Sequence, residues 1–97
     1  MVASDPCWDY QQELLRELAK KSFAELSGLP ARQPLQSPAA LRGWRLSVLR
    51  GDGEHGGVEI AIEARRRRLL IFETVYAPKF EMLPDGTVVE EPLVIDD

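Results

Sequence analysis

Apolar residues recur at helical spacing near the start of the chain and alternate with polar residues through most of its second half. Asp5 suits a helix N-cap, and Pro6 suits the first helical position, where its missing N–H costs nothing. Gly28 suits the residue that closes a helix. The spacing therefore predicts one helix over about residues 5–27. The residues predicted to share its apolar face are Trp8, Leu15, Leu18, Ala19, Ser22 and Leu26.

Three prolines mark the segment that follows the predicted helix. Pro30, Pro34 and Pro38 exclude a long helix and a regular strand, because proline lacks a backbone N–H and has a fixed φ. We expect a Pro-rich connector over residues 29–42 that runs extended across the surface, with one short helical turn before Gly43.

The alternating pattern of the remaining chain predicts an antiparallel β-meander of four strands. A glycine-rich loop around Glu54 separates the first two strands. Symmetric pairing about Glu54 sets Val48 opposite Ile60 and Arg45 opposite Glu63, so that apolar and charged faces match together.

The later strands differ from the first pair in their patterns. Residues 65–68 are four consecutive arginines and are predicted to form the turn into a third strand over 69–76, which is apolar on both faces. A final hairpin turns at Pro84-Asp85-Gly86, which suits a type I turn followed by a left-handed glycine. Its register sets Glu81 opposite Val89.

These elements predict an α+β fold, with an N-terminal helix packed on one face of a four-stranded antiparallel meander. The length of 97 residues suits a single domain. The predicted parts of this domain, residues 1–97, are a helix over about 5–27, the connector 29–42, the meander 43–91 and an acidic tail 92–97.

Charge and composition narrow the function classes. The net charge is −4, and every charged side chain from Asp85 onward is acidic, which disfavours general nucleic-acid binding. Cys7 is the single cysteine, so an intramolecular disulfide and a thiolate metal cluster within one chain are excluded. No signal peptide and no membrane-spanning stretch is recognisable, and we expect a cytoplasmic protein with no membrane association.

The arginine run has two interpretations. Arg65, Arg66, Arg67 and Arg68 are candidates for phosphate or nucleic-acid contacts, because guanidinium groups bind phosphate bidentately. The alternative is a solvated turn whose charges prevent aggregation of neighbouring strands. The run contains no interleaved aromatic residues for base stacking, which favours the solvated turn.

No catalytic or metal-binding constellation is apparent. The segment 52–55 contains two carboxylates and the single histidine, His55, but its spacing matches no metal-binding loop. Cys7 lies in the first helical turn, where a helix dipole lowers thiol pKa values, yet no base is expected beside it. We therefore predict no catalytic residues, no metal and no cofactor.

The apolar surplus of the third strand indicates an interaction surface, most simply for a second copy of the chain. The apolar triplet of the tail is a second candidate, because an exposed strand can add to the sheet of another protein. The candidate interface residues are Leu69, Ile71, Val75, Leu93, Val94 and Ile95.

The sequence thus favours a small non-enzymatic protein-binding or regulatory module that contacts itself as a homodimer or binds another protein. The first alternative is a nucleic-acid-binding module that uses Arg65–Arg68. The second alternative is a small enzyme whose composite site forms at a subunit interface.

Overall fold

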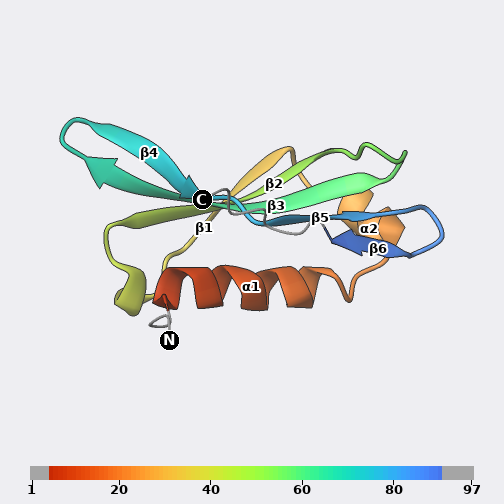
Figure 1. Ribbon diagram of the computed structural model, residues 1–97, viewed down its shortest axis with the longest axis horizontal. Coiled ribbons are helices and arrows are strands. Elements are labelled where there is room, and N and C mark those ends of the chain that lie inside the picture. The colour runs from red at the N-terminus through yellow and green to blue at the C-terminus, as the bar shows by residue number, and fades with distance from the viewer. Residues whose placement is uncertain (1–4, 91–97) are drawn as a thin grey trace, which may run out of the picture.

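The computed structural model describes residues 5–90 and contains helices and an antiparallel sheet, so the fold is α+β (Figure 1). Within this range the sheet has six strands instead of the four predicted. The elements are α1 (Pro6–Leu18), α2 (Phe23–Ser27), β1 (Arg32–Leu35), the 3-10 turn η1 (Ala39–Leu41), β2 (Trp44–Asp52), β3 (Val58–Arg68), β4 (Ile71–Tyr76), β5 (Lys79–Met82) and β6 (Val88–Glu90).

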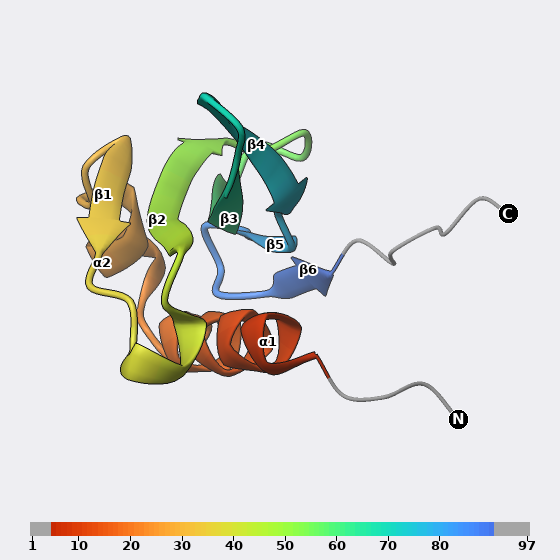
Figure 2. The same cartoon turned by 90° about the vertical axis from the view of Figure 1, so that its left-hand side faces the viewer.

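β3 is the central strand of the sheet. The strand order is β1-β2-β3-β5-β6. β5 and β4 pair with the same edge of β3, β5 with residues 58–61 and β4 with residues 64–68. β4 and β5 therefore act as two successive pieces of one long strand, interrupted at Ala77 and Pro78. Figure 2 shows the sheet curling so that α1 runs beneath one of its faces.

The predicted single helix is two helices. Asp5 caps α1 by accepting a 2.9 Å hydrogen bond from the Cys7 N–H. Ser22 caps α2 in a reciprocal capping box with Glu25. A capping box begins a helix, and this Ser-x-x-Glu signal therefore restarts the helix after a short turn at 19–21.

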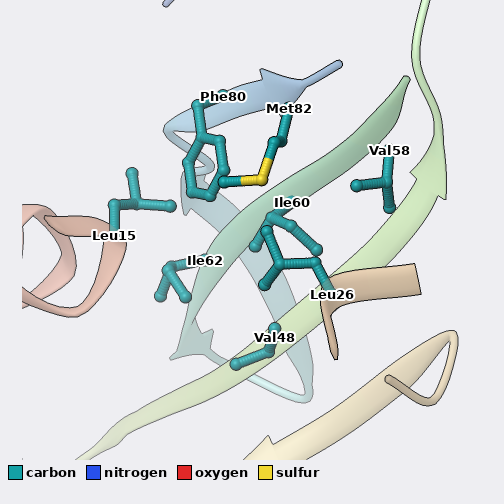
Figure 3. Packing of buried hydrophobic residues seen from close by; sticks show 8 residues of the cluster. All are labelled: Leu15, Leu26, Val48, Val58, Ile60, Ile62, Phe80 and Met82. Carbon is teal, nitrogen blue, oxygen red and sulfur yellow. The ribbon is translucent and has the colours of Figure 1, made fainter. Parts of the chain in front are cut away.

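The main core lies between the helices and the sheet (Figure 3). Leu15 from α1 and Leu26 from α2 pack against apolar side chains that alternate along the strands. This packing uses the strand residues Val48, Val58, Ile60, Ile62, Phe80 and Met82. Burial of each large apolar side chain contributes about 1.5–3 kcal/mol to the free energy of unfolding.

The connector contains a strand that the prolines were expected to exclude. β1 pairs with β2 in spite of Pro34, which lies opposite Ser47. β1 is the first strand in the order, and proline is tolerated at a sheet edge, where one side of the strand needs no N–H donor. The short helical turn predicted before Gly43 is present as η1, and Gly43 follows it with a φ of 92°.

The register of the first hairpin is shifted by two residues from the prediction. Val48 lies opposite Ile62, not Ile60, and Arg45 lies opposite Arg65, not Glu63. A shift of two keeps every side chain on its predicted face, so the apolar pattern alone did not distinguish the two registers. The hairpin closes through the loop 53–57, with a hydrogen bond from the Gly53 N–H to the Gly57 carbonyl.

The arginine run was wrongly predicted to form a turn. β3 continues through Arg68, which pairs with Ile71, and the turn consists of Leu69 and Leu70. The last hairpin is confirmed in its register, because Glu81 lies opposite Val89.

Candidate protein-interaction site

The β3–β4 hairpin projects from one end of the molecule, where β3 and β4 extend past β2 (Figure 1). β2 begins at Trp44, opposite Arg66. Within residues 5–90, the part of β3 beyond Arg66 therefore pairs with β4 alone. The hairpin has one apolar turn at its far end, which we call the leucine tip, formed by Leu69 and Leu70.

The leucine tip is the most exposed large apolar surface among the described residues. Leu69 is 88% exposed, Leu70 is 91% exposed, and the adjoining Ile71 is 64% exposed. Single exposed apolar side chains are ordinary, but three consecutive ones on a projecting turn are typical of contact sites. The leucine tip is therefore the first candidate for a binding surface.

The backbone of the leucine tip is strained. Leu69 has a φ of 57°, and it is the one non-glycine residue with positive φ in the range 5–90. Two-residue hairpin turns favour asparagine and glycine, because a β-carbon is disfavoured in the left-handed region. Leu69 therefore costs stability at this turn, and strained exposed residues cluster at functional sites.

The arginines of the run divide between the two faces of the hairpin. Arg65 and Arg67 share the face of Arg45 and Phe72, because residues opposite each other in register lie on one face. Arg66 lies on the other face, with its guanidinium 5.4 Å from the Trp44 ring centroid.

Two arginines of the first face, Arg45 and Arg65, also contact the ring of Phe72. The Arg45 guanidinium lies 4.1 Å from the centroid of the Phe72 ring, and the Arg65 guanidinium lies 5.9 Å from it. Such cation–π contacts hold the side chains close to the sheet. The hairpin thus combines an apolar end with a basic stem.

Aromatic residues fix the base of the hairpin to the N-terminus of α1. The Tyr76 ring stacks on the Trp44 ring, with 6.1 Å between the ring centroids. It meets the Trp8 ring edge-on, with 5.6 Å between the centroids. The Tyr76 hydroxyl donates a 2.6 Å hydrogen bond to the Asp5 carboxylate. This bond lowers the pKa of Asp5 and raises the pKa of Tyr76.

A cleft of about 400 Å³ lies beside this base, between α1 and the strands β4, β5 and β6. Val75 lines the cleft, because the register of β4 shifts between Thr74 and Tyr76 and leaves Val75 as an extra residue. The apolar part of the lining comes from Trp8, Leu15, Ala19, Val75, Tyr76, Ala77, Pro78, Phe80 and Val88.

The single histidine of the loop 52–55 lies against a buried carboxylate of β5. His55 contacts Glu81 of β5, whose carboxylate accepts hydrogen bonds from the backbone N–H groups of His55 and Gly57 and lies 2.9 Å from His55 Nδ1. Burial of the Glu81 carboxyl opposes ionisation, but these hydrogen bonds outweigh it and lower its pKa. A β-carbon at Gly53 would collide with the Glu81 side chain, so the glycines make room for this carboxylate. The arrangement holds the loop on the sheet.

The surroundings of Cys7 disfavour ionisation of its thiol. Cys7 is buried, which together with the Asp5 charge raises its pKa to about 11, and a thiol of such high pKa is a poor nucleophile. Across residues 5–90, no group of three His, Cys, Asp or Glu side chains is placed to hold a metal ion.

The three predicted interface residues that the structure describes are spread along the hairpin. Leu69 is in the leucine tip, Ile71 adjoins the tip, and Val75 is at the base of the hairpin. Leu93, Val94 and Ile95 lie outside the described residues. Leu70 was not among the predicted interface residues, although an apolar pair directly after a run of arginines is a visible signal of an unusual turn.

No protein-family model matches the chain, and no curated protein or solved structure matches it either. In the part from residue 5 to residue 90, neither helix has the length and apolar character needed to cross a membrane. The function of the chain is therefore inferred from the geometry of the hairpin.

Proposed function

We propose that the chain is a protein-binding module whose contact element is the β3–β4 hairpin. The observation that carries this proposal is the leucine tip, with side chains 88% and 91% exposed on a strained turn. A turn selected for stability alone would carry polar residues or glycine. Contact with a partner provides the reason for leucine at both positions.

The stem of the hairpin indicates the chemistry of the partner surface. Leu69 and Leu70 fit an apolar pocket, and the neighbouring arginines fit carboxylates around its rim. Interfaces commonly combine an apolar centre with a polar rim, and arginine is enriched among the residues that dominate their binding energy. The partner is thus a protein with an apolar pocket bordered by acidic groups.

The proposal is tested with a photoreactive amino acid at position 70 and, as a matched control, at Gln36, an exposed position between β1 and η1. Position 70 is expected to give a discrete cross-linked protein species that position 36 does not give. The captured protein is then purified, and its affinity for the native chain and for the double variant Leu69→Asn, Leu70→Gly is measured.

Asparagine tolerates the positive φ of position 69, and glycine is compatible with any hairpin turn at position 70, so we expect the double variant to keep the fold while removing the apolar tip. We expect its affinity to fall at least tenfold, because burial of each leucine contributes about 1.5–3 kcal/mol and 1.4 kcal/mol corresponds to a factor of ten. Equal affinity of the two chains, with the fold intact, would exclude the leucine tip as the contact.

A second candidate function is nucleic-acid binding through the face that carries Arg45, Arg65, Arg67 and Phe72. This face places arginines around one aromatic ring, a combination found at single-stranded nucleic-acid sites. A gel shift with short RNA and DNA, repeated with Arg65→Ala/Arg67→Ala and with Arg66→Ala on the other face as the control, tests it. Binding that does not respond to the arginine substitutions excludes this candidate.

A further inference from the structure

One edge of β4 faces no other strand of the described chain. β4 and β5 both pair with the same edge of β3. On the opposite edge, β5 pairs with β6, whereas β4 pairs with no described strand. A sheet edge is a template for pairing with another strand. A strand added along β4 would therefore lie in line with β6.

An added strand of this kind would have a defined end point. β6 ends at Glu90, which pairs with Phe80, and Ala77 and Pro78 lie between Phe80 and β4. The new strand would therefore end beside Pro78, next to the cleft at the base of the hairpin. The β4 edge and the cleft thus form one continuous surface.

From these features we infer that the partner of the hairpin is a second copy of this chain, paired antiparallel along β4 across a two-fold axis. This inference rests on the proposed function, because it names the protein that the hairpin contacts. One symmetric contact occupies the β4 edge in both copies and places each leucine tip near the other copy's cleft.

The residues of β4 select the position of the two-fold axis. An axis at Thr74 sets Leu70 of one copy beside Pro78 of the other, and it opposes two threonines, a favourable cross-strand pair. An axis at Glu73 would oppose two carboxylates. An axis at Phe72 would set Leu70 beside Thr74 and leave the tip short of the cleft.

Charge supports a copy of the same chain as the occupant. Residues 65–68 supply four of the 12 Lys and Arg residues, whereas the chain has 16 Asp and Glu residues. The hairpin is thus the basic part of an acidic protein. The cleft lining contains Glu90 as well as Arg16 and Lys79, and Glu90 is the carboxylate that the arginines of the incoming hairpin would approach.

The first measurement is the mass of the full chain by sedimentation over a wide concentration range, with the double variant Leu69→Asn, Leu70→Gly alongside. We expect a dimer for the native chain and at least a tenfold higher dissociation constant for the variant. A monomer at every concentration overturns the inference and leaves the edge to a different protein or to residues 91–97.

The second measurement locates the axis through Thr74→Cys. Opposed residues of antiparallel strands have Cα atoms about 4.5–5.5 Å apart, within reach of a disulfide. We expect mild oxidation to give a covalent dimer of Thr74→Cys but not of Thr87→Cys, an exposed threonine in the β5–β6 turn. Buried Cys7 remains in both chains.

The outcomes separate this inference from the proposed function. A dimer that the tip variant splits but that does not cross-link at position 74 overturns the two-fold axis at Thr74 and keeps the tip as a contact. A monomeric chain whose position 70 cross-links to another protein overturns the second copy and keeps the proposed function. A dimer unaffected by the tip variant contradicts both.

Discussion

At the scale of single residues, Glu81 joins two parts of the chain that are distant in sequence. Its side chain is 7% exposed, and it accepts hydrogen bonds from the loop between β2 and β3. These bonds require the ionised carboxylate as acceptor, and the pKa of Glu81 is lowered from its ordinary value of 4.5 although burial opposes the shift. The charge is therefore a structural element of the loop.

Glu81→Gln is expected to lower the melting temperature by several degrees at pH 7. A lowered pKa in the folded state stabilises the protein above the unfolded value of about 4.5, and this stabilisation is lost as the pH falls through the folded value. The difference between the native chain and the variant should therefore shrink below about pH 4.5. Thermal melts from pH 3 to pH 7 measure it, with Glu54→Gln, exposed in the same loop, as the control. A difference that is constant with pH would show that the Glu81 charge does not hold the loop.

At the scale of elements, Gln11 connects α1 to the interruption between β4 and β5. Its side-chain amide is fully buried and donates hydrogen bonds to the carbonyls of Ile62 (2.8 Å) and Tyr76 (3.4 Å). β3 lacks a regular strand partner where the chain passes Ala77 and Pro78, and the Gln11 amide supplies donors there. One helical side chain thus completes the hydrogen bonding of the sheet.

Gln11→Met preserves the approximate volume of this side chain but removes the donor. We expect the free energy of unfolding to fall by about 1–3 kcal/mol, because a buried carbonyl is left unpaired. Urea denaturation measures the change, and Gln36→Met, at an exposed position, serves as the control. Equal stability of the Gln11 variant and the native chain would show that the carbonyls find other donors.

The sequence predicted those elements whose signals are local. The N-cap at Asp5 and the turn at Gly86 depend on a few adjacent residues, and both are confirmed. The break after α1 was missed because the helical period continues through it and hides the capping signal of Ser22. The register of the first hairpin was missed because the loop position depends on Glu81, which lies 26 residues from His55.

The candidate site was predicted only in part for a similar reason. Leu69 and Ile71 were predicted as interface residues because they are apolar residues of the third predicted strand. They are exposed because Leu69 lies in the two-residue turn at the end of the hairpin and Ile71 directly follows that turn. Arginines in a row suggested a turn, whereas their pairing with Phe72 and Glu73 across the hairpin keeps them in β3. Such pairing is a tertiary property that no local pattern expresses.

At the scale of the whole molecule, the core and the proposed interface occupy different parts of the structure. The residues buried between the helices and the sheet include neither Leu69 nor Leu70. The monomer therefore contains its stabilising core without the leucine tip. Association adds stability by mass action, because a partner that binds only the folded chain shifts the unfolding equilibrium.

The melting temperature of the native chain is accordingly expected to rise by a few degrees for each tenfold increase in concentration above the dissociation constant of the dimer. The double variant Leu69→Asn, Leu70→Gly should begin this rise only at concentrations at least tenfold higher. Its melting temperature at low concentration should equal or slightly exceed the value of the dilute native chain, because the variant also relieves the left-handed leucine. Calorimetry over a hundredfold range of concentration tests both statements. A variant that melts well below the dilute native chain would place the leucine tip within the stabilising structure of the monomer and remove the separation between core and contact.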